Sequence, residues 1–223
     1  MIKRFLIASL LFSSTIYARQ IILVVADDFN TSQAELTCYE NSHAVFSPIR
    51  VNIGRNGLAW DINDNIFIHA HNEPTKHEGD GKAPAGVFAL TGSFGYDDEN
   101  FSLPFTKSDA NRICVDDVNS SLYNRIVTMP QPPPTSFEYM KRDDEQYKIG
   151  AVVDYNPNKI QGLGSCIFLH VEKFAAHPTA GCTSMAYENL KKVLLWLKKE
   201  EKPVLVQVPK KSLPEVKKVF GIE

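Results

Sequence analysis

The chain has 223 residues, with 24 basic and 26 acidic side chains and a formal net charge of −2. Proteins that bind polyanions without sequence preference carry a basic excess that attracts their partners. This chain lacks such an excess, so we expect no nucleic-acid partner. Its length suits one domain with a substantial core.

The first 18 residues have the pattern of a secretory signal. Lys3 and Arg4 precede an apolar run, Phe5 to Phe12, which is too short to span a bilayer. Ala18 is a small residue at a suitable cleavage point, and an uncleaved anchor is the alternative. No later segment is long and apolar enough to cross a membrane. We therefore expect a signal peptide at residues 1–18 and a protein that is soluble in the periplasm or another extracytoplasmic space.

Short strand-like runs, separated by turn residues, dominate the rest of the chain. They alternate apolar and polar residues or are rich in β-branched side chains, which is typical of strands. The predicted strands are residues 20–26, 34–40, 49–57, 65–70, 86–92, 147–156, 165–172 and 203–209. Residues 130–135 (PQPPPT) are predicted to be an extended surface loop, because proline fixes φ and removes donors.

An amphipathic helix is predicted over residues 185–200, where leucine and valine recur on one face. Thr183 or Ser184 is expected to cap its start. Residues 211–220 are predicted to form a short final helix. The pattern as a whole indicates a mainly β domain with one or two flanking helices.

Four cysteines, at positions 38, 114, 166 and 182, allow up to two disulfides in an exported chain. If Cys182 is a nucleophile it must stay free, and at most one bridge then forms among the other three. Cys114–Cys166 is the pairing that we predict.

Cys182 stands just before the predicted helix. Unpaired N–H groups at a helix start lower the pKa of a thiol and can hold an oxyanion. Gly181 lets a substrate approach the backbone. His170, at the end of an apolar strand, is the candidate base, while His177 precedes a proline in the connecting loop.

Three separated segments resemble the L,D-transpeptidase catalytic-domain family (YkuD-type). The strand GSCIFLH, which ends at His170, is followed by TAGC, Thr179 to Cys182, at the position of the family's Ser/Thr-His-Gly-Cys signature. Residues 76–96 and 53–60 resemble its central stretch and its early strand-turn. Ala180 replaces the usual histidine, and TSM stands where an arginine often follows the cysteine. Both departures match a subgroup with PTAGCT signatures.

The resemblance implies an L,D-transpeptidase-like β-sandwich or barrel with flanking helices and no cofactor or metal. It places the catalytic domain at residues 49–209. Residues 19–48 would pack on it as N-terminal strands, and residues 210–223 would form a short C-terminal helix.

The resemblance also implies a mechanism. Cys182 attacks the L-to-D amide between the third and fourth residues of a peptidoglycan stem peptide, and His170 takes the thiol proton and returns it to the leaving amine. An amine acceptor then resolves the thioester into a 3→3 cross-link, whereas water makes the enzyme an L,D-carboxypeptidase. Oxyanion or substrate contacts are expected from the following residues: Lys76, Glu78, Asp80, His177, Thr179, Gly181 and Thr183.

Two other functions remain possible. A zinc-dependent hydrolase would use His69, His71 and His77, although their spacing fits no zinc motif. A wall-binding module without turnover would explain the missing signature histidine, but it would need neither Cys182 nor His170. Asp116, Asp117 and Asn119 are expected to serve turns rather than substrate, because Asp and Asn favour turns.

Overall fold

A computed structural model describes residues 19–222, so the predicted signal peptide lies outside the described residues. The strands are β1 (Gln20–Ala26), β2 (Gln33–Glu40), β3 (His43–Ala44), β4 (Ile49–Asn52), β5 (Leu58–Trp60), β6 (Ala83–Gly95), β7 (Phe105–Lys107), β8 (Arg112–Val115), β9 (Arg125–Thr128), β10 (Phe137–Tyr139), β11 (Ile149–Val153), β12 (Phe168–Val171), β13 (Thr183–Met185) and β14 (Val204–Pro209). The helices are α1 (Tyr187–Trp196), α2 (Leu213–Phe220) and two single 3-10 turns, η1 (Lys199–Glu201) and η2 (Lys210–Ser212). The predicted mainly β class with flanking helices is confirmed.

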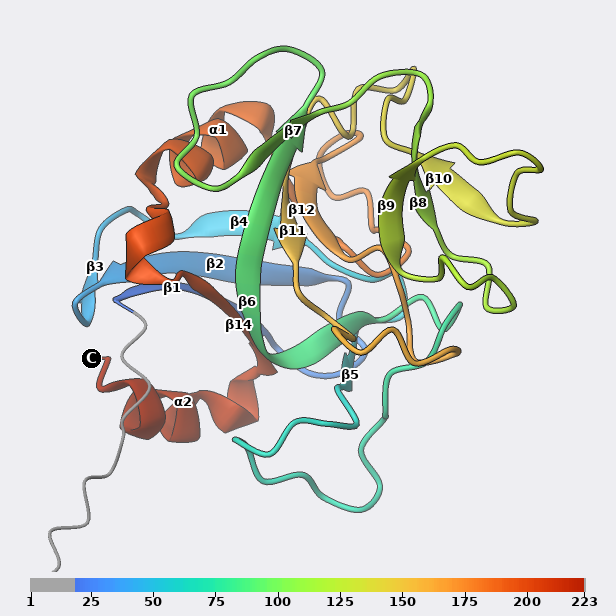
Figure 1. Cartoon of the computed structure of the whole chain (residues 1–223). Coiled ribbons are helices and arrows are strands. Elements are labelled where there is room, and N and C mark those ends of the chain that lie inside the picture. Colours follow the sequence, from blue (N-terminus) through green and yellow to red (C-terminus); the bar gives the residue numbers. More distant parts are fainter. Residues whose placement is uncertain (1–18, 223) are drawn as a thin grey trace, which may run out of the picture.

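Eight strands close into a barrel (Figure 1). Their order is β1–β14–β6–β11–β12–β13–β4–β2, and β2 pairs with β1 to complete the ring. The β1–β14 and β12–β13 pairs are parallel, and the other pairs of the ring are antiparallel. The barrel encloses a large apolar core, to which β1 contributes Ile22 and Val24, both fully buried. Burial of this surface is the main source of stability.

The two helices lie on opposite sides of the barrel (Figure 1). α1 packs on β11 and β12 and buries Leu190, Val193 and Leu194. α2 buries Val216. No helix within residues 19–222 is long and apolar enough to cross a membrane.

The predicted start of the first helix is wrong. Residues 183–185 form β13, and the N-cap of α1 is Ala186, which makes no side-chain capping bond. Thr183 and Ser184 are therefore strand residues rather than caps. Pairing with β12 supplies the backbone hydrogen bonds that this segment would otherwise have made in a helix.

The predicted strand at residues 65–70 is also absent, and this segment is a loop. Asp64 accepts a hydrogen bond from the amide of Phe67 at 3.1 Å, which closes a local turn. Phe67 packs into the core while Ile68 is 84% exposed, so the alternation reflects a turn and not a sheet. The other seven predicted strands overlap β1, β2, β4, β6, β11, β12 and β14.

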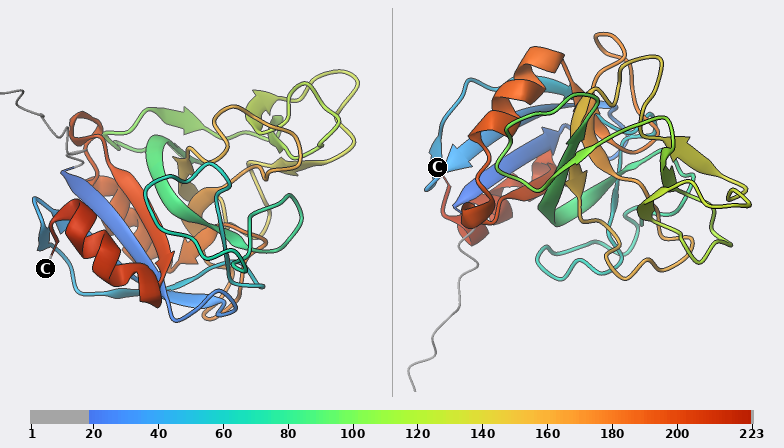
Figure 2. Two further views of the ribbon diagram at one scale, coloured as in Figure 1. Left: turned by 90° about the horizontal axis from the view of Figure 1, so that it is seen from below. Right: turned by 45° about the horizontal axis from the view of Figure 1, so that its top comes forward.

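Residues 96–148, between β6 and β11, form an insertion on one side of the barrel (Figures 1 and 2). Part of it is a separate small sheet with the strand order β10–β8–β9. A disulfide joins Cys114 of β8 to Cys166, just before β12, which confirms the predicted pairing. Cys38 and Cys182 are free and buried. The bridge therefore ties the insertion to the strand that carries His170.

Candidate active site

Cys182 and His170 point to the same, outer face of the barrel. β12 and β13 run parallel with Leu169 opposite Thr183 and His170 opposite Ser184. Since side chains alternate along a strand, Leu169 and Thr183 face the core, and His170 and Cys182 face outwards. The sulfur of Cys182 lies beside Phe168, whose amide donates to it at 3.3 Å.

The local setting of Cys182 differs from the predicted helix start. The residue precedes a strand, so no helix N-terminus acts on its thiol. Its S–H donates to the carbonyl of Cys166 at 3.3 Å, which stabilises the protonated form. Burial, aided by the negative charge of Glu138, raises the pKa of Cys182 to about 12. The resting thiol is therefore protonated, in contrast to the thiolate expected at a helix start.

His170 is held as a neutral imidazole with one defined tautomer. Its Nδ1 lies 2.8 Å from the carbonyl oxygen of Val171, and because a carbonyl only accepts, Nδ1 carries the proton. Nε2 therefore keeps a free lone pair. Burial lowers the pKa of His170 to about 4, and the charge of Arg142 acts in the same direction.

The thiol and the imidazole are neighbours but are not hydrogen-bonded. Along the strand direction, His170 is two residues beyond Phe168, which is about 7 Å at the usual strand rise. Within residues 19–222 the thiol bonds to Phe168 and Cys166 instead of to His170. Proton transfer thus requires the cysteine to leave its present rotamer, as is common in unliganded sites.

An aromatic group forms the floor beneath this pair. The rings of Phe94, Tyr147 and Phe168 meet edge to face with centroids 5.2 to 5.7 Å apart. Tyr147 also contacts the His170 ring at 5.3 Å. Gly150 makes room for this floor, since a Cβ there would lie 2.3 Å from Phe94. The floor limits the rotation of His170.

A polar cavity of about 180 Å³ opens over Cys182. Lys76 and Glu78, both predicted to shape a substrate cleft, line it. The other lining residues are Arg55, Gly79, Asp116, Glu138, Ser165, Cys166, Ile167, Ala180, Gly181 and Cys182. A carbonyl group of a peptide entering this cavity would meet the thiol.

Lys76 and Glu78 are fixed by their own partners. The Lys76 ammonium is 3% exposed and donates to Asp80 Oδ1 at 2.7 Å and to the His77 carbonyl at 2.6 Å. Glu78 Oε2 accepts from the hydroxyls of Tyr123 at 2.5 Å and Ser165 at 2.6 Å. Asp80 does not line the cavity, because its carboxylate organises the 76–82 turn.

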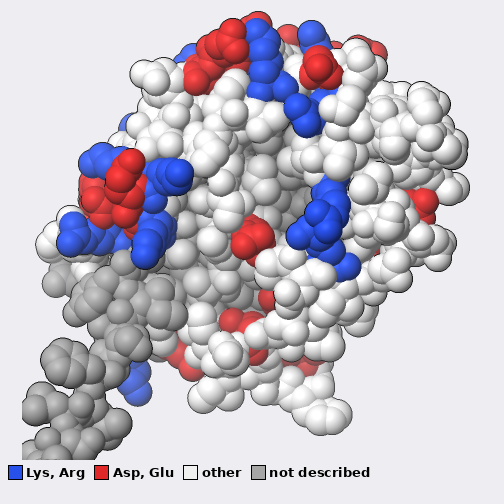
Figure 3. Space-filling model, viewed as in Figure 1, with Lys and Arg blue, Asp and Glu red and all other residues white. Residues whose placement is uncertain are grey.

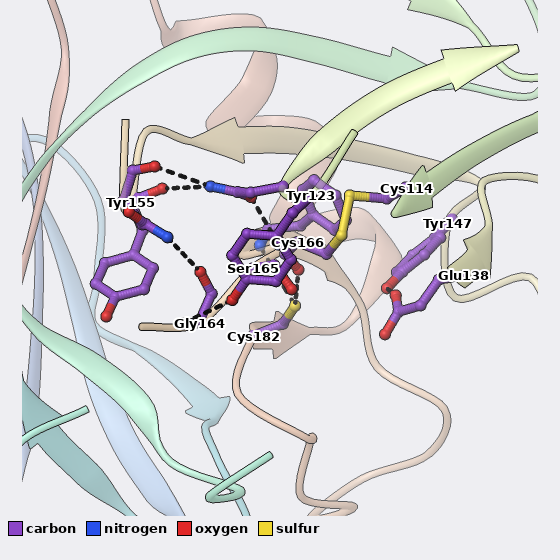
Figure 4. The surroundings of a disulfide bond; sticks show 12 residues. Cys114, Tyr123, Glu138, Tyr147, Tyr155, Gly164, Ser165, Cys166 and Cys182 are labelled. Atoms are coloured by element: carbon purple, nitrogen blue, oxygen red, sulfur yellow. Dashed lines mark hydrogen bonds between the residues drawn. A yellow bond between two sulfur atoms is a disulfide. The ribbon is translucent and has the colours of Figure 1, made fainter. Parts of the chain in front are cut away.

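The insertion supplies residues that sequence reasoning missed. Glu138 of β10 lines the cavity and accepts a hydrogen bond from the hydroxyl of Tyr147, which connects the cavity to the His170 contact (Figure 4). Burial raises the pKa of Glu138.

Asp116, expected to serve a turn, also lines the cavity, and its buried Oδ1 has no hydrogen-bond partner within residues 19–222. Asp117 does serve a turn, since it accepts from the amide of Asn119.

The TAGC segment is a tight turn that presents Cys182. The Thr179 hydroxyl donates to the Cys182 carbonyl at 2.6 Å and accepts from the Gly181 amide at 3.1 Å. A Cβ on Gly181 would lie 3.0 Å from the carbonyl oxygen of Lys82. Thr179 is thus a positioning residue. The Cys182 amide makes no turn or side-chain hydrogen bond in residues 19–222, so it is free to donate to an oxyanion.

Two predicted contact residues lie elsewhere. The Thr183 hydroxyl points into the barrel and donates to Gln207 Oε1 at 2.7 Å. His177 lies in the loop after β12, with its ring 4.4 Å from that of Phe174, and does not line the cavity. The position of Thr183 follows from the alternation of side chains along a strand, because Cys182 faces outwards and the next residue then faces the core.

The three upstream histidines are not gathered at one point. His69 bonds to Asp64 at 2.8 Å and stacks on Trp60 with centroids 4.2 Å apart, whereas His71 and His77 are exposed. In the described part of the chain, no group of three or more His, Cys, Asp or Glu side chains is placed to hold a metal.

Known proteins with a similar sequence or structure are few. No family model matches the chain, and no curated protein matches it. Among solved structures, the chain is similar to the helical cell shape determining protein Pgp2 (K307A mutant) from Campylobacter jejuni, with 15% identity and a TM-score of 0.42. The alignment covers 87% of this chain and 49% of that one, so the chain spans about half of its length. A likeness of this level carries no argument about function.

Proposed function

We propose that this protein is an exported, cysteine-dependent L,D-transpeptidase that acts on peptidoglycan stem peptides through a thioester. The observation that carries the proposal is the free Cys182 in a polar cavity, on the same sheet face as His170, while Cys114 and Cys166 are bridged. The sequence resemblance to the family supplies the substrate class and the extracytoplasmic location.

The neutral state of both groups defines the order of proton transfer. As the sulfur attacks the amide carbonyl, Nε2 of His170 accepts the thiol proton, and the imidazolium then protonates the leaving D-amino acid. The Cys182 amide donates to the oxyanion. An amine from a second stem peptide attacks the thioester, forms the new amide and releases the thiol.

The test is product analysis by mass spectrometry. The mature chain is incubated with tetrapeptide-bearing wall fragments, and we expect cross-linked dimers. Tripeptides alone would identify an L,D-carboxypeptidase instead. Cys182→Ala should abolish both products, whereas Cys38→Ala, the other buried free cysteine, should retain them.

Two results would contradict the proposal. One is the absence of any product from a folded wild-type chain, and the other is undiminished turnover by Cys182→Ala. A wall-binding module would show a third pattern. It would bind wall fragments without forming product, and Cys182→Ala would change neither the binding nor the absence of turnover. Loss of activity with a chelator, but not with an alkylating agent, would favour a metal-dependent hydrolase.

A further inference from the structure

A second cavity, of about 330 Å³, adjoins the Cys182 cavity at the Cys166–Ile167 segment. β9 of the insertion and β11 of the barrel form its walls together with the segment leading into β12. Cys166 and Ile167 line both cavities, so a single stretch of backbone separates them.

The two cavities differ in charge. Arg125 and Lys159 line the second cavity, and no acidic residue does. Within residues 19–222 neither cation forms an ion pair, and Arg125 is exposed. Figure 3 shows basic side chains gathered on this face of the molecule, over β9. The Cys182 cavity, in contrast, is lined by three carboxylates, and its buried Lys76 is paired with Asp80.

The floor of the second cavity is apolar. Ile126, Val152 and Phe168 line it next to the disulfide. A guanidinium above an apolar floor suits a ligand with a carboxylate and short aliphatic groups, because guanidinium matches carboxylate geometry and the floor buries the aliphatic part.

The wall between the cavities is firmly held. Asn124 accepts from the Cys166 amide at 3.0 Å and donates to the carbonyls of Tyr155 and Asn156, both at 3.0 Å (Figure 4). The disulfide anchors the same residue to β8. Phe168 lines the second cavity, and its amide donates to the Cys182 sulfur. The cavity is thus built into the active-site framework.

We propose that the second cavity binds a carboxylate of the stem peptide and that Arg125 and Lys159 determine this specificity. The inference rests on the proposed function, which supplies the peptide. Stem peptides offer such a group on the γ-linked glutamyl residue, one residue before the residue whose carbonyl Cys182 attacks. A peptide that reaches both cavities passes over Cys166 and Ile167, the residues that the two cavities share.

The test compares paired peptides on the full mature chain. A tetrapeptide with the free glutamyl α-carboxylate and its α-carboxamide form are titrated calorimetrically into Cys182→Ala protein. We expect about tenfold tighter binding of the carboxylate, as for an exposed charge-assisted pair. Adding Arg125→Ala and Lys159→Ala should remove this preference, whereas Arg50→Ala, an exposed arginine of β4, should not.

Steady-state kinetics of the double variant with Cys182 intact provides the second readout. KM for the carboxylate peptide should rise about tenfold with kcat nearly unchanged, because binding is lost without loss of chemistry. A preference that survives in the double variant, or equal binding of both peptides by the parent, overturns the inference and leaves the proposed function standing. Failure of the intact chain to bind or turn over either peptide overturns both.

Discussion

The rate of Cys182 alkylation should rise steeply with pH, because the resting thiol is protonated. Its pKa is raised from 9.0 to about 12. At neutral pH this leaves about a thousandfold less thiolate than in an unperturbed thiol, since each unit of pKa is tenfold. The difference corresponds to about 4 kcal/mol in favour of the protonated form.

Iodoacetamide trapping measures this directly, because only the thiolate reacts. We expect the rate constant to increase about tenfold per pH unit from pH 7 to pH 9. Burial of the sulfur slows the reaction at every pH, so the slope and not the absolute rate carries the information. The experiment uses Cys38→Ala protein, because Cys38 is the other free thiol, and intact-mass spectrometry follows the adduct.

A rate that is flat between pH 6 and pH 9 would refute this reasoning. It would mean that a thiolate–imidazolium pair exists before substrate binds. Unchanged circular dichroism over the pH range is the necessary control, since partial unfolding would expose the sulfur and steepen the profile.

Three further predictions concern stability. The pKa of His170 in the folded chain, about 4, lies below the unfolded value of 6.5, so the unfolded chain binds the proton more tightly. Stability should therefore be complete above about pH 6.5 and fall by about 3 kcal/mol towards pH 4, and urea unfolding of His170→Gln should lack this dependence. Replacing both Cys114 and Cys166 by alanine should lower the free energy of unfolding by about 4 kcal/mol, as expected for a bridge that spans 52 residues, and calorimetry would contradict this with an unchanged Tm. Thr183→Val should cost about 1–3 kcal/mol in chemical denaturation by leaving Gln207 Oε1 without its donor inside the barrel, yet leave the alkylation rate of Cys182 unchanged.

Local patterns were sufficient to predict most of the barrel strands. β1 (QIILVVA) and β14 (VLVQVP) are rich in β-branched residues, which favour strands. Reserving Cys182 as the nucleophile left three possible pairings among Cys38, Cys114 and Cys166, and the count of cysteines did not choose between them. For the strands, the information lies within a few residues.

The electrostatic character of the site could not be predicted in this way. It depends on the pairing of β13 with β12, because Thr183–Met185 form this strand instead of the start of the predicted helix. The insertion brings Glu138 and Tyr147 to the pair although 23 to 44 positions separate them from His170 and Cys182 in the chain, and no motif marks them. Burial, which raises the thiol pKa and lowers that of the imidazole, is a property of the assembled fold.

The pairing of β1 with β14 has a consequence for how the protein is made. The last strand of the ring lies between β1 and β6, so the ring cannot close until the chain through Pro209 is free to fold. Until then β1 and β6 each expose an unpaired edge, which is the kind of surface that chaperones shield from aggregation. Mature chains truncated shortly before Val204 should therefore remain protease-sensitive, whereas chains that extend beyond Pro209 should be resistant.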